Sequence, residues 1–233
     1  MNNNTEYKIT LKKFWIHLST ICRHKFWVMY YCFKCGIPWR GLVHDLSKFS
    51  PTEFWTNVKY TVPGISPIEI QKKEEGFSIS WQHHKGHNPH HYEYWMDRFD
   101  DGCYVARMPF EYSLEMLCDF LAAGKAYSKE KFTFAGEWSW WEKQKEIRNM
   151  HPDNTRFIDT VLFLLYKAEE ESECDILIIK KSKDEKHDIY RWLNGLTIDK
   201  ILDYEFLRSL YYFKVDPDTP TMVKIRQPKE EEK

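Results

Sequence analysis

The sequence predicts a mainly α-helical protein, with a helical domain over residues 1–170 and a small α+β extension over residues 171–233. Three observations lead to this fold class. Apolar residues recur at helical spacing through much of the longer part. Proline follows a serine or asparagine at several points, a combination typical of helix starts. After about residue 171 the pattern changes to short runs of β-branched and aromatic residues, which are typical of strands.

The N-terminal part is predicted to contain three helices. Residues 8–35 carry apolar positions at helical spacing and stop at Gly36, a residue type that commonly ends helices. The stretch IPWRGLVHDL indicates a short helix opened by Pro38. At residues 50–53, SPTE combines a serine cap, a proline at the first helical position and a glutamate three residues after the cap. This is a capping box, and it predicts another helix.

The middle of the chain repeats these devices. SPIE at 66–69 predicts a helix that runs toward His87. NPHH at 88–91 again places a proline after a capping residue, so a new helix or a kink is expected there. Pro109 opens a helix through FEYSLEMLCDFLAAGKAY. Two more helices are predicted at 137–150 and 154–170.

The extension is predicted to mix strands and helices. CDILIIKK at 174–181 and SLYYFKV at 209–215 have the composition of strands. Between them, residues 184–194 and 198–208 have helical patterns.

Composition excludes several classes of protein. Apolar residues make up 42% of the chain, which is enough to fill a core. The formal net charge of −1 argues against a protein that mainly grips nucleic acid. No run reaches the ~18–20 apolar residues of a membrane span, and the polar start lacks a signal peptide, so we expect a cytoplasmic protein. Cys32-x-x-Cys35 could be half of a zinc site, but its apolar helical setting favours buried thiols.

Histidines are concentrated in one stretch, HHKGHNPHH at 83–91, which holds five of the ten in the chain. Histidine is an indifferent helix former and is costly to bury without a partner, so this crowding needs a reason. The flanking residues Trp81, Tyr92 and Trp95 argue against a purely solvated face. We favour metal binding by this cluster, with a surface or core role as the alternative.

The spacing within the cluster supports convergence. His83 and His87 are four residues apart, His84 and His87 three, and His87 and His91 four. Residues at these spacings share one face of a helix. Several imidazoles can therefore converge on one point, even with a kink at Pro89.

Two further residues lie in apolar helical surroundings. His24 lies on the first long helix, where a lone histidine is more often a satisfied core residue. Asp119 lies in LEMLCDFLAAG, which otherwise has the pattern of a buried helix. A buried carboxylate needs a cation or several donors. A metal ion would supply that compensation for Asp119, and a salt bridge to an arginine or lysine is the alternative.

These residues form an ordered set that resembles the HD superfamily of metal-dependent phosphohydrolases: His24, His44-Asp45, the histidine cluster and Asp119. HDLSK is similar to the HDxGK motif of the HD-GYP phosphodiesterases, with Ser47 in place of glycine. The GYP signature itself is replaced by KGHNPHHYEYW, so a cyclic-dinucleotide substrate is not supported. The pattern also resembles an uncharacterised bacterial and phage family, a domain of unknown function with HDLSKF and HNPHH motifs. The resemblance covers roughly residues 10–170 and implies an HD-domain-like helical bundle.

The resemblance also implies a set of ligands. One metal would be held by His24, His44, Asp45 and Asp119, with Asp45 bridging to a second metal. The second site would take its imidazoles from His83, His84, His87, His90 and His91. Mixed imidazole and carboxylate ligation suits Mn, Fe, Co, Ni or Zn, with two or more ions per chain.

Two neighbouring cations lower the pKa of a shared water and neutralise charge on a phosphoryl group. The function expected from the resemblance is therefore hydrolysis of a phosphate ester, of a nucleotide or related small molecule, by a metal-activated hydroxide. Asp45 and Lys48 would belong to the catalytic machinery, and Lys48 and Lys85 could each clamp a phosphate as a point charge. The alternatives are an HD-type di-iron oxygenase and a non-catalytic, metal-stabilised binding protein. The sequence gives no strong sign of nucleic acid or membrane partners.

Overall fold

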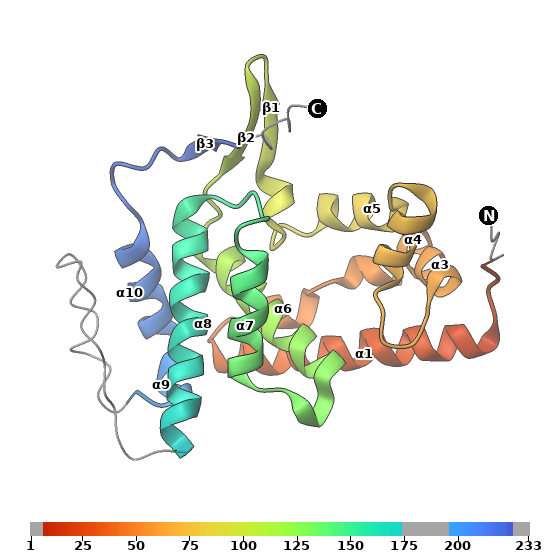
Figure 1. Ribbon diagram of the computed structural model, residues 1–233, viewed down its shortest axis with the longest axis horizontal. Coiled ribbons are helices and arrows are strands. Elements are labelled where there is room, and N and C mark those ends of the chain that lie inside the picture. Colours follow the sequence, from red (N-terminus) through yellow and green to blue (C-terminus); the bar gives the residue numbers. More distant parts are fainter. Residues whose placement is uncertain (1–6, 174–195, 226–233) are drawn as a thin grey trace, which may run out of the picture.

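The described residues of this computed structural model, 7–173 and 196–225, form ten α-helices and one small sheet (Figure 1). The mainly α prediction with a small α+β part is confirmed. The helices are α1 (Leu11–Lys34), α2 (Pro38–Val43), α3 (Pro51–Tyr60), α4 (Pro67–Glu75), α5 (Ile79–His87), α6 (Phe110–Ser128), α7 (Phe134–Gln144), α8 (Pro152–Glu173), α9 (Ile198–Ile201) and α10 (Tyr204–Lys214).

The long helix α1 runs along one edge of the molecule, and most other helices lie on one side of it (Figure 1). Its C-terminal half packs against α6, and its N-terminal half against α3. Helix α5 packs on α3. Side chains from α1, α5 and α6 meet around the His44-Asp45 motif.

A three-stranded antiparallel sheet joins the middle of the chain to its C-terminal part. β1 (Met96–Phe99) and β2 (Gly102–Ala106) form a hairpin, and β3 (Met222–Lys224) pairs with β2 so that Val223 lies opposite Val105. The sequence did not predict this hairpin. Its strands are only four and five residues long and mostly exposed, so they lack a strong alternating pattern.

Several predicted helix starts are confirmed. The Ser50 hydroxyl caps α3 by accepting a hydrogen bond from the Glu53 backbone N–H at 3.3 Å. Pro38 and Pro51 open α2 and α3 as the sequence predicted. Gly36 follows α1 with a φ of 74°, a conformation that glycine adopts without steric cost.

Other predictions in the middle of the chain were wrong. The helix from SPIE does not reach His87, because Gly76 ends α4 with a φ of 77° and α5 starts anew at Ile79. The Ser66 side chain makes no capping hydrogen bond. NPHH does not open an α-helix, since Asn88 caps the C-terminus of α5 and only a short 3-10 helix, Tyr92–Trp95, follows.

The SLYYFKV segment forms part of α10 and is not a strand. Leu207, Leu210 and Tyr211 are buried on one face of this helix, at positions three and four residues apart. This helical burial pattern outweighs the β-propensity of the aromatic residues. The predicted strand at 174–181 and helix at 184–194 lie outside the described residues.

The main hydrophobic core forms around α6. Leu114, Leu117 and Leu121 on this helix are fully buried, and they belong to one cluster with Val28 of α1 and Phe157 of α8. Burying a side chain of this size contributes about 1.5–3 kcal/mol. Helix α6 is therefore a rigid support for the polar residues that it also carries.

The C-terminal residues join the same core. Leu207, Leu210 and Tyr211 of α10 are members of the cluster that includes the leucines of α6. The Tyr211 hydroxyl donates a hydrogen bond to the Met108 carbonyl. The division into a domain over residues 1–170 and an extension over residues 171–233 stays a prediction. Among the described residues, no helix has the length and apolar composition that a membrane span requires.

Glu137 of α7 is buried in this interior, and burial raises the pKa of its carboxyl to about 7. The pKa of this carboxyl is thus higher in the folded state than its value of 4.5 in the unfolded state. The neutral carboxyl therefore favours the folded state fully below pH 4.5, and this contribution to stability is lost as the pH rises through 7. We expect Glu137→Gln to raise the free energy of unfolding at pH 8 by about 2–3 kcal/mol relative to wild type.

Urea denaturation at pH 5 and pH 8 measures this effect. Glu142→Gln, on the exposed side of the same helix, is the matched control and should leave the pH dependence unchanged. If wild type and Glu137→Gln lost the same free energy of unfolding between pH 5 and pH 8, ionisation of the Glu137 carboxyl would not be the cause of that loss.

Candidate metal centre

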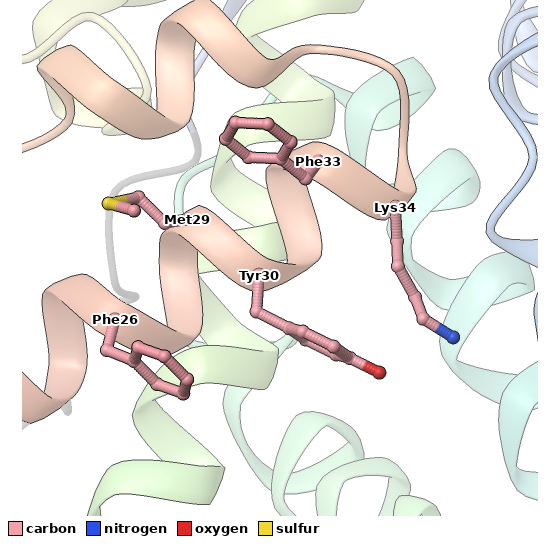
Figure 2. A pocket seen from close by; sticks show the side chains of 5 residues that line it. All are labelled: Phe26, Met29, Tyr30, Phe33 and Lys34. Carbon is pink, nitrogen blue, oxygen red and sulfur yellow. The ribbon is translucent and has the colours of Figure 1, made fainter.

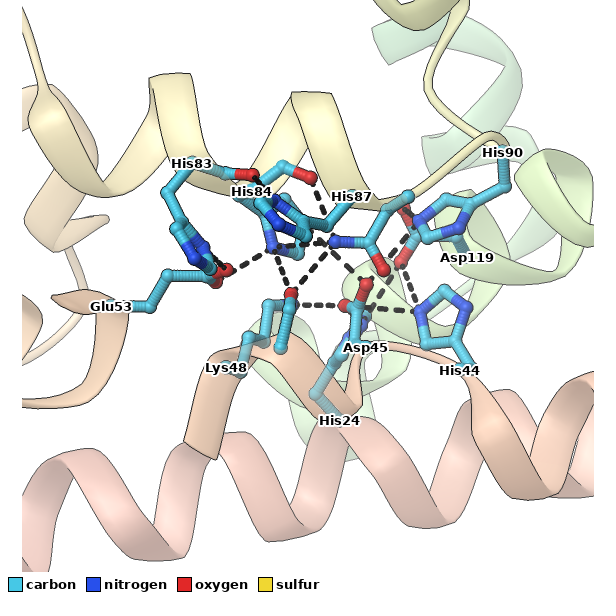
Figure 3. A network of polar contacts seen from close by, with 12 residues as sticks. His24, His44, Asp45, Lys48, Glu53, His83, His84, His87, His90 and Asp119 are labelled. Atoms are coloured by element: carbon cyan, nitrogen blue, oxygen red, sulfur yellow. Dashed lines mark hydrogen bonds and ion pairs between the residues drawn. The ribbon is translucent and has the colours of Figure 1, made fainter. Parts of the chain in front are cut away.

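The His44-Asp45 motif lies in a sharp turn between α2 and a 3-10 helix, Leu46–Phe49 (Figure 3). Asp45 has a φ of 53°, the one positive value at a non-glycine residue in the described part of the chain. Aspartate tolerates this left-handed conformation better than most residues. Lys25 holds the turn by donating hydrogen bonds to the carbonyls of Leu42 at 2.8 Å and His44 at 2.5 Å. The result is that both motif side chains are buried.

A first group of possible ligands joins three parts of the chain: His24, His44, Asp45 and Asp119. His24 Nε2 lies 2.9 Å from Asp119 Oδ1, and His44 Nε2 lies 3.0 Å from Asp45 Oδ2. His24 Nε2 is 3.8 Å from the same Asp45 oxygen. Helices α1 and α6 thus bring residues 95 positions apart in sequence to one point.

A second group lies on the other side of the Asp45 carboxylate: Asp45, His84, His90 and His91. His84 Nε2 is 3.3 Å and His90 Nε2 is 3.4 Å from Asp45 Oδ1. The rings of His90 and His91 have centroids 4.2 Å apart. Asp45 is therefore shared by both groups, with Oδ2 facing the first and Oδ1 facing the second.

Most donor atoms of these groups form no well-aligned hydrogen bond, although several make ion-pair contacts with one another or with Lys48. Six such buried atoms are Nε2 of His24, His44, His90 and His91, and both Oδ atoms of Asp45. A buried polar atom without a partner costs about 1–3 kcal/mol. Cations at the two groups would compensate for these unpaired atoms, so the residues fit metal ions both in chemistry and in position.

Two buried glutamates hold the outer nitrogens of the imidazoles. Glu115 Oε1 accepts a hydrogen bond from His44 Nδ1 at 2.9 Å and lies 3.3 Å from His90 Nδ1. Glu53 Oε2 accepts from His84 Nδ1 at 2.8 Å. Because Nδ1 carries the proton in these contacts, Nε2 presents its lone pair to the interior.

Sequence reasoning missed the role of both glutamates. Glu115 lies four residues before Asp119 on the same helix, and this spacing could have indicated it. Glu53 was assigned to a capping box, but its carboxylate binds His83 and His84 while Ser50 donates its backbone N–H to the Ser47 carbonyl.

Comparison with protein-family models gives a match over residues 13–163 to Family of unknown function (DUF5662). The chain belongs to this family. The match spans both groups of ligands. No curated protein and no solved structure matched the chain. The match agrees with the resemblance to a family without known function, and the finer resemblance to HD phosphohydrolases depends on the sequence motifs alone.

In the DUF5662 site, neighbouring opposite charges favour the ionised forms of Asp45 and His44. Burial alone would raise the pKa of Asp45, but His44 and Lys48 outweigh it and hold that pKa well below its usual value. Burial alone would lower the pKa of His44, but Asp45, Asp119 and Glu115 raise it well above its usual value. The raised pKa favours a second proton on His44, at the place where a cation would bind.

The same balance applies to Glu115. Burial would raise the pKa of this carboxyl, but hydrogen bonds from His44 and His90 lower it to about 2. Glu115 is therefore ionised at any pH at which the protein functions, and it acts only as an acceptor.

Two of the predicted histidine ligands lie outside both groups. His83 Nδ1 donates to Glu53 Oε1 at 2.7 Å, and its ring stacks on that of His87 with centroids 4.1 Å apart. His87 is exposed and donates from Nδ1 to the His83 carbonyl at 2.7 Å. The His83 side chain points toward Glu53 (Figure 3), and His84 is the α5 histidine that is grouped with Asp45.

The two lysines proposed to bind substrate differ in position. Lys48 Nζ lies 2.5 Å from Asp45 Oδ2, at the edge of the site. Lys85 is half-buried on α5, directly after His84 in the sequence. Taken together, the DUF5662 chain has buried His, Asp and Glu side chains that can hold metal ions.

Proposed function

We propose that this DUF5662 protein is a metal-dependent phosphohydrolase that cleaves a phosphate ester of a nucleotide or related small molecule. The observation that carries the proposal is the sharing of the Asp45 carboxylate between two groups of imidazole and carboxylate donors. Such a carboxylate can offer one oxygen to each of two ions. When bound, a pair of divalent cations lowers the pKa of water and neutralises charge on a phosphoryl group.

The mixture of imidazole and carboxylate donors suits Mn, Fe, Co, Ni or Zn. Within the first group, His24, His44 and Asp119 would hold one ion together with Asp45. Within the second, the imidazoles would come from His84, His90 and His91. His83 and His87 have other contacts and are not needed for either set.

The site reaches solvent on one side, which sets where a substrate can approach. The side chains of His24 and Asp119 are 11% and 14% exposed, whereas those of Asp45 and His84 are 3% exposed. Lys48 lies beside this opening with 23% of its side chain exposed. Its ammonium group can turn from Asp45 to a phosphate oxygen while its stem stays in place.

The direct test combines metal analysis with a substrate screen. The purified protein is expected to contain about two transition ions per chain. It should hydrolyse phosphate monoesters or diesters when Mn, Co, Ni or Zn is added. Bound iron with a visible absorption band and no esterase activity would favour the di-iron oxygenase. Full metal occupancy without any turnover would favour a non-catalytic, metal-stabilised protein.

Lys48 offers a sharper prediction within this function. We expect Lys48→Met to raise KM for the ester at least ~10-fold, because the variant loses a charged hydrogen bond to phosphate worth about 1.5–3 kcal/mol. The metal content of the variant should be unchanged, since Lys48 is not a metal ligand. Lys85→Met is the comparison variant, and we expect it to keep the wild-type KM. An equal loss in both variants would contradict the assignment of the clamp to Lys48.

A further inference from the structure

The outer face of α1 carries a continuous apolar stripe. At successive spacings of four and three residues the solvent-facing positions are Leu11, Trp15, Ser19, Cys22, Phe26, Tyr30 and Phe33. Five of these are large hydrophobic residues that stay 41–74% exposed. The opposite face of α1, with residues such as Val28 and Cys32, is already buried in the core. Helix α1 is therefore apolar on two opposite faces, and the second face has no cover within the described chain.

The stripe is too large to be incidental. Five half-exposed aromatic and leucine side chains present roughly 500 Å² of apolar surface. Monomeric proteins rarely expose more than a few hundred Å² in one patch, and larger patches mark interfaces. Near the C-terminal end of α1 the surface is hollowed into a groove lined by Phe26, Met29, Tyr30, Phe33 and Lys34 (Figure 2).

The order of small and large residues along the stripe is the same from either end of the helix. Small residues, Ser19 and Cys22, lie on either side of a midpoint between Thr20 and Ile21. At equal distances from this midpoint lie Trp15 and Phe26, and farther out Leu11 and Tyr30. An antiparallel pair of helices places residues at equal distances from a two-fold axis against each other, so this stripe is complementary to itself.

We propose that the α1 stripe binds a second copy of this chain in an antiparallel, two-fold arrangement centred between Ser19 and Cys22. Phe26 packs against Trp15 of the partner subunit. Tyr30, which lines the groove, packs against Leu11 of the partner subunit. The small residues at the centre let the helix axes approach closely, and the large residues fill the two ends.

The apolar area of the stripe fits an interface with a second copy of this chain. A standard interface takes about 800 Å² from each partner. The apolar stripe supplies more than half of that area, and its flanks supply the remainder. The flanks include Lys12 and Arg23, which are exposed, and α1 contains five basic residues and no acidic residue. Because an antiparallel pair brings like flanks together, salt should strengthen the dimer by screening this repulsion.

Solution mass measures the proposal directly. Light scattering after size exclusion should give twice the 28.3 kDa of one chain, with a larger dimer fraction at 0.5 M than at 0.05 M NaCl. Phe26→Glu should shift the protein to monomer. Phe77→Glu, a similarly exposed residue in the turn between α4 and α5, is the matched control and should stay dimeric. Because Phe26 is 59% exposed, the monomeric variant should keep the circular dichroism of wild type.

A disulfide tests the register of the helices. In a Cys103→Ser, Cys174→Ser background, Ser19→Cys should form a covalent dimer with oxidised glutathione, because residue 19 faces the native Cys22 of the partner subunit. Adding Cys22→Ser should remove this cross-link. A wild-type protein that is monomeric at 100 μM would overturn the proposal. Monomer that instead co-sediments with anionic lipid vesicles at low salt would assign the stripe to a membrane surface.

Discussion

Replacing Asp45 by asparagine is expected to abolish the binding of both metal ions that the proposed function requires. Asp45 is the residue common to the two ligand groups, so its loss removes a charged oxygen from each. Loss of an outer-shell partner alone typically weakens metal binding 10–100-fold, so the affinity for each ion should fall by more than ~100-fold. Asparagine tolerates the left-handed backbone that Asp45 adopts, so the turn itself should persist.

Metal analysis of dialysed protein measures this prediction. Wild type should retain its ions, Asp45→Asn should retain almost none, and turnover of any ester should disappear with them. Asp97→Asn, an exposed carboxylate of β1, is the matched control and should behave as wild type. Full metal occupancy in Asp45→Asn would show that the ions bind elsewhere.

Replacing Glu115 by glutamine should weaken metal binding about 10–100-fold without removing a ligand. Nδ1 of His44 and Nδ1 of His90 both face the same carboxylate oxygen, Oε1. A neutral amide oxygen in that place accepts weaker hydrogen bonds than a carboxylate oxygen does, so the two imidazoles are held less firmly. The variant also leaves Arg40, which lies 3.1 Å from the carboxylate, without its ionic partner.

Titration of the metal-free protein with Mn or Zn gives the affinity. Glu111→Gln, one helical turn earlier on α6, is the matched control and should not alter it. A Glu115→Gln protein with wild-type affinity would mean that this carboxylate does not orient the imidazoles.

The sequence predicted those parts of the fold that depend on local signals. Proline and serine at helix starts, and Gly36 after α1, mark ends that short-range geometry determines. The turn at Gly76 was missed because a glycine within a helical pattern can either continue or end the helix. Helix α10 was missed because its aromatic residues also suit a strand, and only packing against α8 and α6 decides between the two.

For the candidate site, the sequence indicated the residues that meet but not the arrangement of the five clustered histidines. His83, His84 and His87 all satisfy helical spacing, yet one helix can turn only one face toward Asp45. Glu53 determines the choice by binding His83 and His84 through different oxygens. That contact joins residues 30 positions apart, and periodicity carries no information about it.

The docking of α10 onto the helices around α6 has a consequence for the boundaries of this family. The family match ends at residue 163, within α8 and before α10 begins. A shortened chain that stops there would leave the side of Phe157 that meets Tyr211 bare to water. We therefore expect a chain that ends at residue 163 to be less stable than the full chain.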